Sequence, residues 1–194
     1  MRLVLASGSS RRADLMSRLG VEFSIEPADV DEGRRPNEPA ATYVERLARE
    51  KSLAVSDPET VAIGADTAVV HGGQIMGKPA HPQEARTMLE RLQGDVHEVF
   101  TGVAVSRGDE VWSLVDVTEV EMLPMTEEEI ADYVTTGEPM DKAGAYALQG
   151  RGGLYVSAIR GSPFTVIGLP IHLLPRLLAQ CGADLAHFNR ADAV

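Results

Sequence analysis

Three features are scarce in this sequence, and each scarcity argues against a class of protein. One cysteine, Cys181, among 194 residues cannot form an internal disulfide, which suits a reducing compartment and predicts a cytoplasmic protein. No run of about 18 apolar residues is present, and residues 1–6 are too short for a secretory signal, so no membrane association is expected. Lys plus Arg total 18 against 29 Asp plus Glu, and the net charge of −11 argues against a nucleic-acid polymer as partner.

The remaining composition is typical of one globular domain. Apolar residues make up 44% and charged residues 24% of the chain, which is enough apolar material for a substantial core. No linker rich in Gly, Pro and Ser separates the two halves, and no internal repeat occurs. We therefore expect a single domain over residues 1–194, with or without a cleft.

The apolar spacing predicts an α/β fold with a mixed sheet. Strands are expected at residues 3–6, 21–25, 61–70, 75–76, 96–106, 110–122 and 154–159. Helices are expected at residues 11–20, 39–56, 82–94, 126–137 and 170–181, where Pro175 must kink the last helix or delay its start. Because helices alternate with strands and long hairpins, a strictly parallel sheet is excluded.

The first candidate site is the segment Ser7-Gly8-Ser9-Ser10-Arg11-Arg12, between an apolar strand and a helix. The start of a helix presents unpaired N–H groups and the positive end of the helix dipole, so it can bind an anion. The two arginines oppose that dipole and would cost stability without an anion nearby. The segment therefore predicts a phosphate site, and a serine N-cap followed by solvated arginines is the alternative.

The second candidate is Asp66, the one charged residue between Val61 and Val70. A lone carboxylate in such an apolar strand costs several kcal/mol unless it is paired, protonated or bound to a metal. Gly64 and Ala65 leave room beside the chain, which favours a site. A strand end at which Asp66 meets water is the alternative.

Lys51 is the third candidate because it lies on the apolar stripe of its helix. It follows Tyr43 and Leu47 at the next i+4 position, where another aliphatic residue would be expected. Its ammonium either reaches into a site or extends past the edge of the core into water.

Two further segments offer a lysine and an acid. Residues 72–79 (GGQIMGKP) partly match a P-loop, but Pro79 stands where the magnesium-binding hydroxyl belongs, so we reject the P-loop and keep Lys78 as a candidate that faces phosphate. The acidic loop at residues 29–32 (DVDE) has the oxygen ligands that suit Mg²⁺, although such loops are usually just solvated. The five histidines and Cys181 show no zinc-ligand spacing.

Taken together, these segments resemble the Maf family of nucleoside triphosphate pyrophosphatases. The matching stretches are LVLASGSSRR (3–12), AREK (48–51), IGADTAVV (63–70), GKP (77–79), EVFTGVAV (98–105), GEPMDKAGAYALQGRGG (137–153) and VIGLP (166–170). They occur in the family's order and cover nearly the whole chain.

The resemblance implies a Maf/ITPase-like fold with two lobes around a central nucleotide cleft, and often a homodimer. It implies hydrolysis of a nucleotide to its monophosphate and pyrophosphate with Mg²⁺ or another divalent cation such as Mn²⁺. Asp66 then corresponds to the proton acceptor and, with Glu32, to a metal ligand. Ser7, Arg12, Lys51 and Lys78 correspond to residues that face the triphosphate, with Lys51 and Lys78 counted among the catalytic set.

Arg11, Thr67 and Gln149 correspond to positions linked to base selection, and the AYALQG stretch resembles the dTTP/UTP branch of the family. Two alternatives stay open. One is a pyrophosphatase of the 7-methyl-GTP type. The other is a nucleotide-binding regulator of cell division without significant catalysis, which would have no need of the acid and lysine set.

Overall fold

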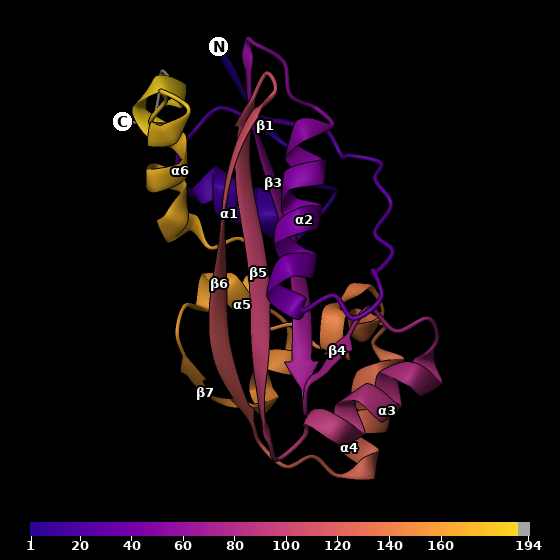
Figure 1. The fold of residues 1–194 in the computed structure, drawn as a ribbon. Helices are drawn as coiled ribbons and strands as arrows, with labels where there is room; N and C mark the ends of the chain where they lie inside the picture. Colours follow the sequence, from indigo (N-terminus) through magenta and orange to yellow (C-terminus); the bar gives the residue numbers. More distant parts are fainter. Residues whose placement is uncertain (190–194) are drawn as a thin grey trace. The chain divides into compact units, whose positions relative to one another are not determined.

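The structure is a computed structural model of the chain, and it describes residues 1–189 (Figure 1). Within this range no helix combines the length and the apolar character that crossing a membrane requires. The chain divides into two compact units. The first unit contains residues 1–66, 101–116 and the described residues from 168 onward, and the second contains residues 67–100 and 117–167. Three strands, β3 (Thr60–His71), β5 (Val96–Arg107) and β6 (Glu110–Met122), contribute to both.

In the first unit, the strands follow the order β2 (Ser24–Ile25), β1 (Arg2–Leu5), β3, β5 and β6. β1 runs parallel to both of its neighbours, with Leu5 opposite Ile63 of β3. The helices are α1 (Ser10–Arg18), α2 (Ala40–Leu53) and α6 (Leu174–Gln180), with 3-10 turns at Ile171–Leu173 and Leu185–Phe188. In Figure 1, α2 lies in front of the strands of this unit and α1 lies behind them, so the strands are covered on both faces.

Two glycines allow α2 to lie directly against the strands. A Cβ atom added to Gly64 of β3 would lie 2.2 Å from the carbonyl oxygen of Ala48 and 2.6 Å from the amide nitrogen of Ser52. A Cβ atom on Gly102 of β5 would lie 2.4 Å from the carbonyl oxygen of Val44. Because every other residue type carries that atom, only glycine permits this separation of helix and strands.

In the second unit, β4 (Gln74–Met76) pairs antiparallel with β3, and β7 (Val156–Arg160) pairs antiparallel with β6. Helices α3 (Pro82–Leu92) and α4 (Glu127–Thr135) supply Leu89, Leu92 and Ile130 to one apolar core. After α4 come three 3-10 turns, at Glu138–Asp141, Ala143–Ala145 and Arg151–Tyr155, and the short helix α5 lies at Pro163–Ile167.

The prediction of an α/β fold with a mixed sheet flanked by helices is confirmed, because parallel and antiparallel pairs occur in one sheet. The strands predicted at residues 61–70 and 75–76 form a hairpin, with Gly72 and Gly73 both at positive φ in its turn. Pro175 lies in the first turn of α6, where its missing N–H is tolerated, so it delays the start of that helix.

Two strands begin later than predicted, and one helix was not predicted. The predicted strand at residues 21–25 is a strand only at Ser24–Ile25, because Val21 is fully buried and forms an isolated bridge with Asn189 instead. The strand predicted at residues 154–159 begins at Val156, because residues 151–155 form a 3-10 turn. The short helix α5 was not predicted, since five residues are too few to carry a helical apolar period.

We expect Gly64→Ala to lower the free energy of unfolding by about 1–3 kcal/mol or more, because the added methyl group collides with backbone atoms that cannot rotate away. Urea unfolding followed by circular dichroism measures this. Gly77→Ala is the matched control, since a Cβ atom there meets nothing within 4 Å. Equal unfolding midpoints for the two variants would contradict the expectation.

Candidate active site

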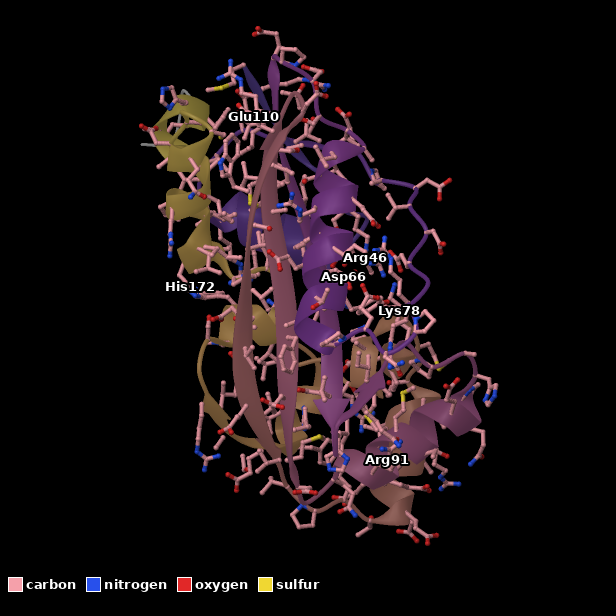
Figure 2. The ribbon with its side chains drawn as sticks, viewed as in Figure 1. Arg46, Asp66, Lys78, Arg91, Glu110 and His172 are labelled. Atoms are coloured by element: carbon pink, nitrogen blue, oxygen red, sulfur yellow. The ribbon has the colours of Figure 1, made fainter. Side chains whose placement is uncertain are left out.

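Three charged side chains of the first unit meet at one point. The Lys51 ammonium lies 2.7 Å from Oδ1 of Asp66 and 2.6 Å from Oε1 of Glu32. The side chains of Lys51 and Asp66 are only 9% and 12% exposed, whereas that of Glu32 is 52% exposed. We call these three residues the Lys51 cluster, and Figure 2 labels its member Asp66.

The close approach of α2 to β3 accounts for the first of these contacts. Lys51 follows Val44, Leu47 and Ala48 on the buried face of α2. Asp66 lies two residues after Gly64, so both point to the same face of β3, the face on which α2 packs. The ammonium of Lys51 is therefore held between carboxylates and does not extend into water.

The Lys51 cluster has a donor set that fits a divalent cation. Two carboxylates converge on one positive charge, and no group of three or more His, Cys, Asp and Glu residues suitable for a metal occurs within residues 1–189. Mg²⁺ is usually bound through one or two carboxylates, with substrate phosphates and water supplying the other oxygens. Glu32 and Asp66 match that pattern, so a metal here would depend on the substrate for its remaining ligands.

Side chains of α2 hold the loop that carries Glu32. The Tyr43 hydroxyl donates a hydrogen bond to the carbonyl oxygen of Glu32 (3.1 Å), and Arg46 Nη2 donates to that of Gly33 (3.0 Å). Arg46 also pairs with Glu38 through two hydrogen bonds of 2.7 and 2.9 Å. In Figure 2, Arg46 extends from α2 toward this loop. These bonds restrict the backbone at the carbonyl group of Glu32 and at the residue that follows it.

The pairing of Arg46 with Glu38 is strong because Glu38 is nearly buried. Its side chain is only 4% exposed, and the hydrogen bonds from Arg46 lower the pKa of Glu38 to about 2. The same hydrogen bonds raise the pKa of Arg46. Neither residue stands out in the sequence, because an arginine and a glutamate eight positions apart have no periodic relation, so these loop-holding residues were missed.

The start of α1 has the features of an anion site. Ser9 is the N-cap residue, but its side chain makes no capping hydrogen bond, and no acidic residue lies in the first turn. Ser7 Oγ accepts hydrogen bonds from the Ser9 amide (3.3 Å) and from Arg12 Nη1 (3.1 Å). The alternative of a serine cap with solvated arginines does not describe Arg12, whose Nε also donates to the carbonyl oxygen of Gly168 (2.7 Å).

Arg12 is also coupled electrostatically to the Lys51 cluster. Burial lowers the pKa of Arg12, and the charge of Asp66 opposes that shift. Arginine keeps its proton in proteins, so the guanidinium stays positive next to the cluster. The first unit thus combines an acidic pair, a buried ammonium and a basic helix start.

The family model described as "Maf-like protein" matches residues 2–181. The chain belongs to the Maf family. The resemblance inferred from the motifs is therefore confirmed at the level of the family.

Several curated Maf relatives share nearly half of their residues with this chain. A "dTTP/UTP pyrophosphatase" of Anaeromyxobacter dehalogenans (strain 2CP-C) is 49% identical over 189 residues, covering 95% of this chain and 96% of the relative. A protein of the same name from Hahella chejuensis (strain KCTC 2396) is 46% identical, covering 95% of this chain and 94% of the relative. Among solved structures, that of the Staphylococcus aureus Ham1 protein gives a TM-score of 0.48 at 16% identity, covering 93% of this chain and 99% of that one.

The remaining residues that the Maf motifs indicate lie in the second unit or on the first turn of α1. Thr67 follows Asp66 directly on β3, so its side chain points to the opposite face of the strand. Lys78 is exposed just after β4, and Gln149 is exposed in the turn at residues 147–150. Arg11 is partly exposed in the first turn of α1. Their roles in nucleotide binding stay predictions.

We expect Lys51→Met to lower the free energy of unfolding by about 3–5 kcal/mol, because it leaves the nearly buried Asp66 carboxylate beside Glu32 without a cation. Adding Asp66→Asn to that variant should recover part of the loss. A double-mutant cycle of urea unfolding measures the coupling between the two residues. Strictly additive losses would contradict an ion pair of this strength.

Proposed function

We propose that this Maf protein hydrolyses nucleoside triphosphates, with dTTP and UTP preferred, to the nucleoside monophosphate and pyrophosphate. Eight curated relatives at 43–49% identity carry the name dTTP/UTP pyrophosphatase, which supports this substrate class. The observation that carries the proposal is Asp66, a carboxylate nearly buried in an apolar strand and bonded to the ammonium of Lys51. A structural role alone would not require a charge at this position.

In this proposal Asp66 accepts the proton of the attacking water. Its Oδ1 accepts a hydrogen bond from the Lys51 ammonium (2.7 Å), and we assign the contact with the water to Oδ2. The bond to Lys51 fixes the orientation of the carboxylate before substrate binds, so no reorganisation is needed at the moment of attack. Cleavage between the α- and β-phosphates then releases pyrophosphate as the leaving group.

The positive groups of the chain bind the triphosphate. Ser7, Arg12 and the uncapped amides at the start of α1 offer hydrogen bonds to phosphate oxygens, and Lys51 supplies an ammonium next to Asp66. We assign Lys78 to the same role on the departing pyrophosphate. Because these groups act locally, the net charge of −11 is no obstacle to binding a polyanion.

Glu32 and Asp66 would hold a divalent cation, Mg²⁺ or Mn²⁺, in this proposal. Such a cation, when bound, neutralises charge on phosphate oxygens. The exposure of Glu32 and the hydrogen bond from Tyr43 to its backbone let this carboxylate turn toward a ligand while its loop stays in place.

Base selection is assigned to Arg11, Thr67 and Gln149. The Arg11 side chain can donate hydrogen bonds and those of Thr67 and Gln149 can donate and accept them, and a mismatched base would leave buried polar groups unpaired. A 7-methyl-GTP enzyme and a regulator without catalysis are the competing outcomes. The Lys51 cluster favours an enzyme, since binding alone does not need a carboxylate held for proton transfer.

We place the reaction in the cytoplasm, where the buried free thiol of Cys181 stays reduced, and a homodimer stays a prediction.

We expect Asp66→Asn to lower kcat about 10²- to 10⁴-fold, because it removes the proton acceptor while keeping the shape of the side chain. The assay separates orthophosphate from pyrophosphate after incubation with dTTP and Mg²⁺. Asp109→Asn, an exposed substitution in the β5–β6 turn, is the matched control. Orthophosphate as the product, or normal turnover by Asp66→Asn, would overturn the proposed reaction.

We expect Glu32→Gln to raise the Mg²⁺ concentration needed for half-maximal activity roughly tenfold, because a neutral amide is a weaker ligand than a carboxylate. Magnesium titration at saturating dTTP measures this. Asp29→Asn, in the same loop, is the control. If both variants kept the wild-type magnesium dependence, the metal would have to bind elsewhere.

A further inference from the structure

In the second unit, Tyr133 and Glu138 hold the turn that carries Gln149. Tyr133 lies on α4, and Glu138 begins the 3-10 turn that follows it. The Tyr133 hydroxyl donates a hydrogen bond of 2.7 Å to Oε1 of Glu138. The turn at residues 147–150 lies between two stretches of backbone that this pair contacts.

The pair binds backbone amides at both ends of the turn. At its first residue, the amide of Ala147 donates to the Tyr133 hydroxyl (3.2 Å). After it, the amides of Arg151 and Gly152 donate to Oε2 and Oε1 of Glu138, at 3.0 and 3.1 Å. One tyrosine and one glutamate thus fix both ends of a four-residue turn, and Gln149 is its third residue.

Glycines occur where the pair touches the backbone. A Cβ atom on Gly150 would lie 2.3 Å from Oε2 of Glu138, and one on Gly152 would lie 2.5 Å from the Tyr133 hydroxyl oxygen. A larger residue at either position would force the pair and the turn apart. The sequence LQGRGG at residues 148–153 is therefore matched to the two side chains that hold it.

The protonation states suit this arrangement. Burial raises the pKa of Tyr133, and its hydrogen bond to Glu138 raises it further, so the phenol keeps its proton. Burial acts to raise the pKa of Glu138 too, but the hydrogen bonds from Tyr133 and from the amides of Gly152 and Arg151 lower it below its ordinary value. At neutral pH a neutral donor therefore faces an ionised acceptor.

We propose that Tyr133 and Glu138 are positioning residues for base recognition, which set the turn at residues 147–150 so that Gln149 faces the edge of the nucleobase. This inference rests on the proposed function, in which Gln149 contacts the base. Within the turn, the Gly150 amide donates to the carbonyl oxygen of Ala147 at 3.3 Å, which is a long hydrogen bond. The hydrogen bonds from the turn to Tyr133 and Glu138 therefore determine how well the exposed side-chain amide of Gln149 is oriented before substrate binds.

The experiment compares Tyr133→Phe and Glu138→Gln, each alone and combined with Gln149→Ala. The measured quantity is the ratio of kcat/KM for dTTP to that for dATP. Each single variant should lower the ratio about tenfold or more, mainly through a higher KM for dTTP, as expected for a lost polar contact. In the Gln149→Ala background neither should lower it further, because both act through Gln149.

Hydrogen exchange gives a second readout that does not depend on turnover. The amides of residues 147, 151 and 152 should exchange at least about tenfold faster in Glu138→Gln or Tyr133→Phe than in the wild type. Tyr155→Phe is the matched control, since Tyr155 packs against Tyr133 with ring centroids 6.1 Å apart. This substitution removes only the Tyr155 hydroxyl and leaves the hydrogen bonds to Glu138 in place. This control should change neither the ratio nor the exchange.

The outcomes separate the inference from the proposed function. If Gln149→Ala lowers the ratio but folded Tyr133→Phe and Glu138→Gln do not, the positioning role is wrong and the base assignment of Gln149 stands. If the wild type shows no preference for dTTP, or Gln149→Ala keeps it, the base assignment fails and the inference fails with it. Glu138→Gln keeps the test decisive should Tyr133→Phe not fold.

Discussion

The ion pair between Lys51 and Asp66 is the interaction on which the arrangement of the first unit depends. Each charge would be costly without the other, because both side chains are nearly buried between α2 and β3. The pair forms because the helix and strand backbones approach closely at Gly64, two residues before Asp66. Glu32 joins from a loop that the same helix holds through Tyr43 and Arg46. Helix α2 thus supplies the cation and also restrains one of the two acids.

In both units, side chains from neighbouring helical segments hold an irregular segment through hydrogen bonds to its backbone. In the first unit, Tyr43 and Arg46 donate to backbone carbonyl groups of the acidic loop. In the second, Tyr133 and Glu138 accept from backbone amides around the turn at residues 147–150. Neither segment has a helix or sheet ladder to satisfy its backbone, so side chains of the neighbouring helical segments take that role. We propose functions for Glu32 and Gln149, both of which are exposed.

The residues that could be found from the sequence are those that break a pattern. Asp66 interrupts an apolar strand and Lys51 interrupts an apolar helix stripe, and each pattern depends only on near neighbours in the chain. Arg46 and Glu38 could not be found this way, because a charged residue on an amphipathic helix is normally solvated. Tyr133 fits its helix as an ordinary core residue, and its hydrogen-bond partners Glu138 and Ala147 lie beyond the end of that helix, 5 and 14 positions away, where no helical period relates them to it.

Gly64 and Gly102, which lie against α2, limit the substitutions that the packing of α2 on the strands tolerates. At residues 64 and 102 the atoms that exclude a side chain are backbone atoms of the helix, so no change in the helix side chains can make room for a larger residue. A bulkier residue could enter only if the whole helix moved away, and that movement would separate Lys51 from Asp66. Substitutions in the two loops leave this spacing untouched. Among descendants of this chain, the glycines at residues 64 and 102 should therefore be inherited unchanged, together with the helix-to-strand spacing that they permit.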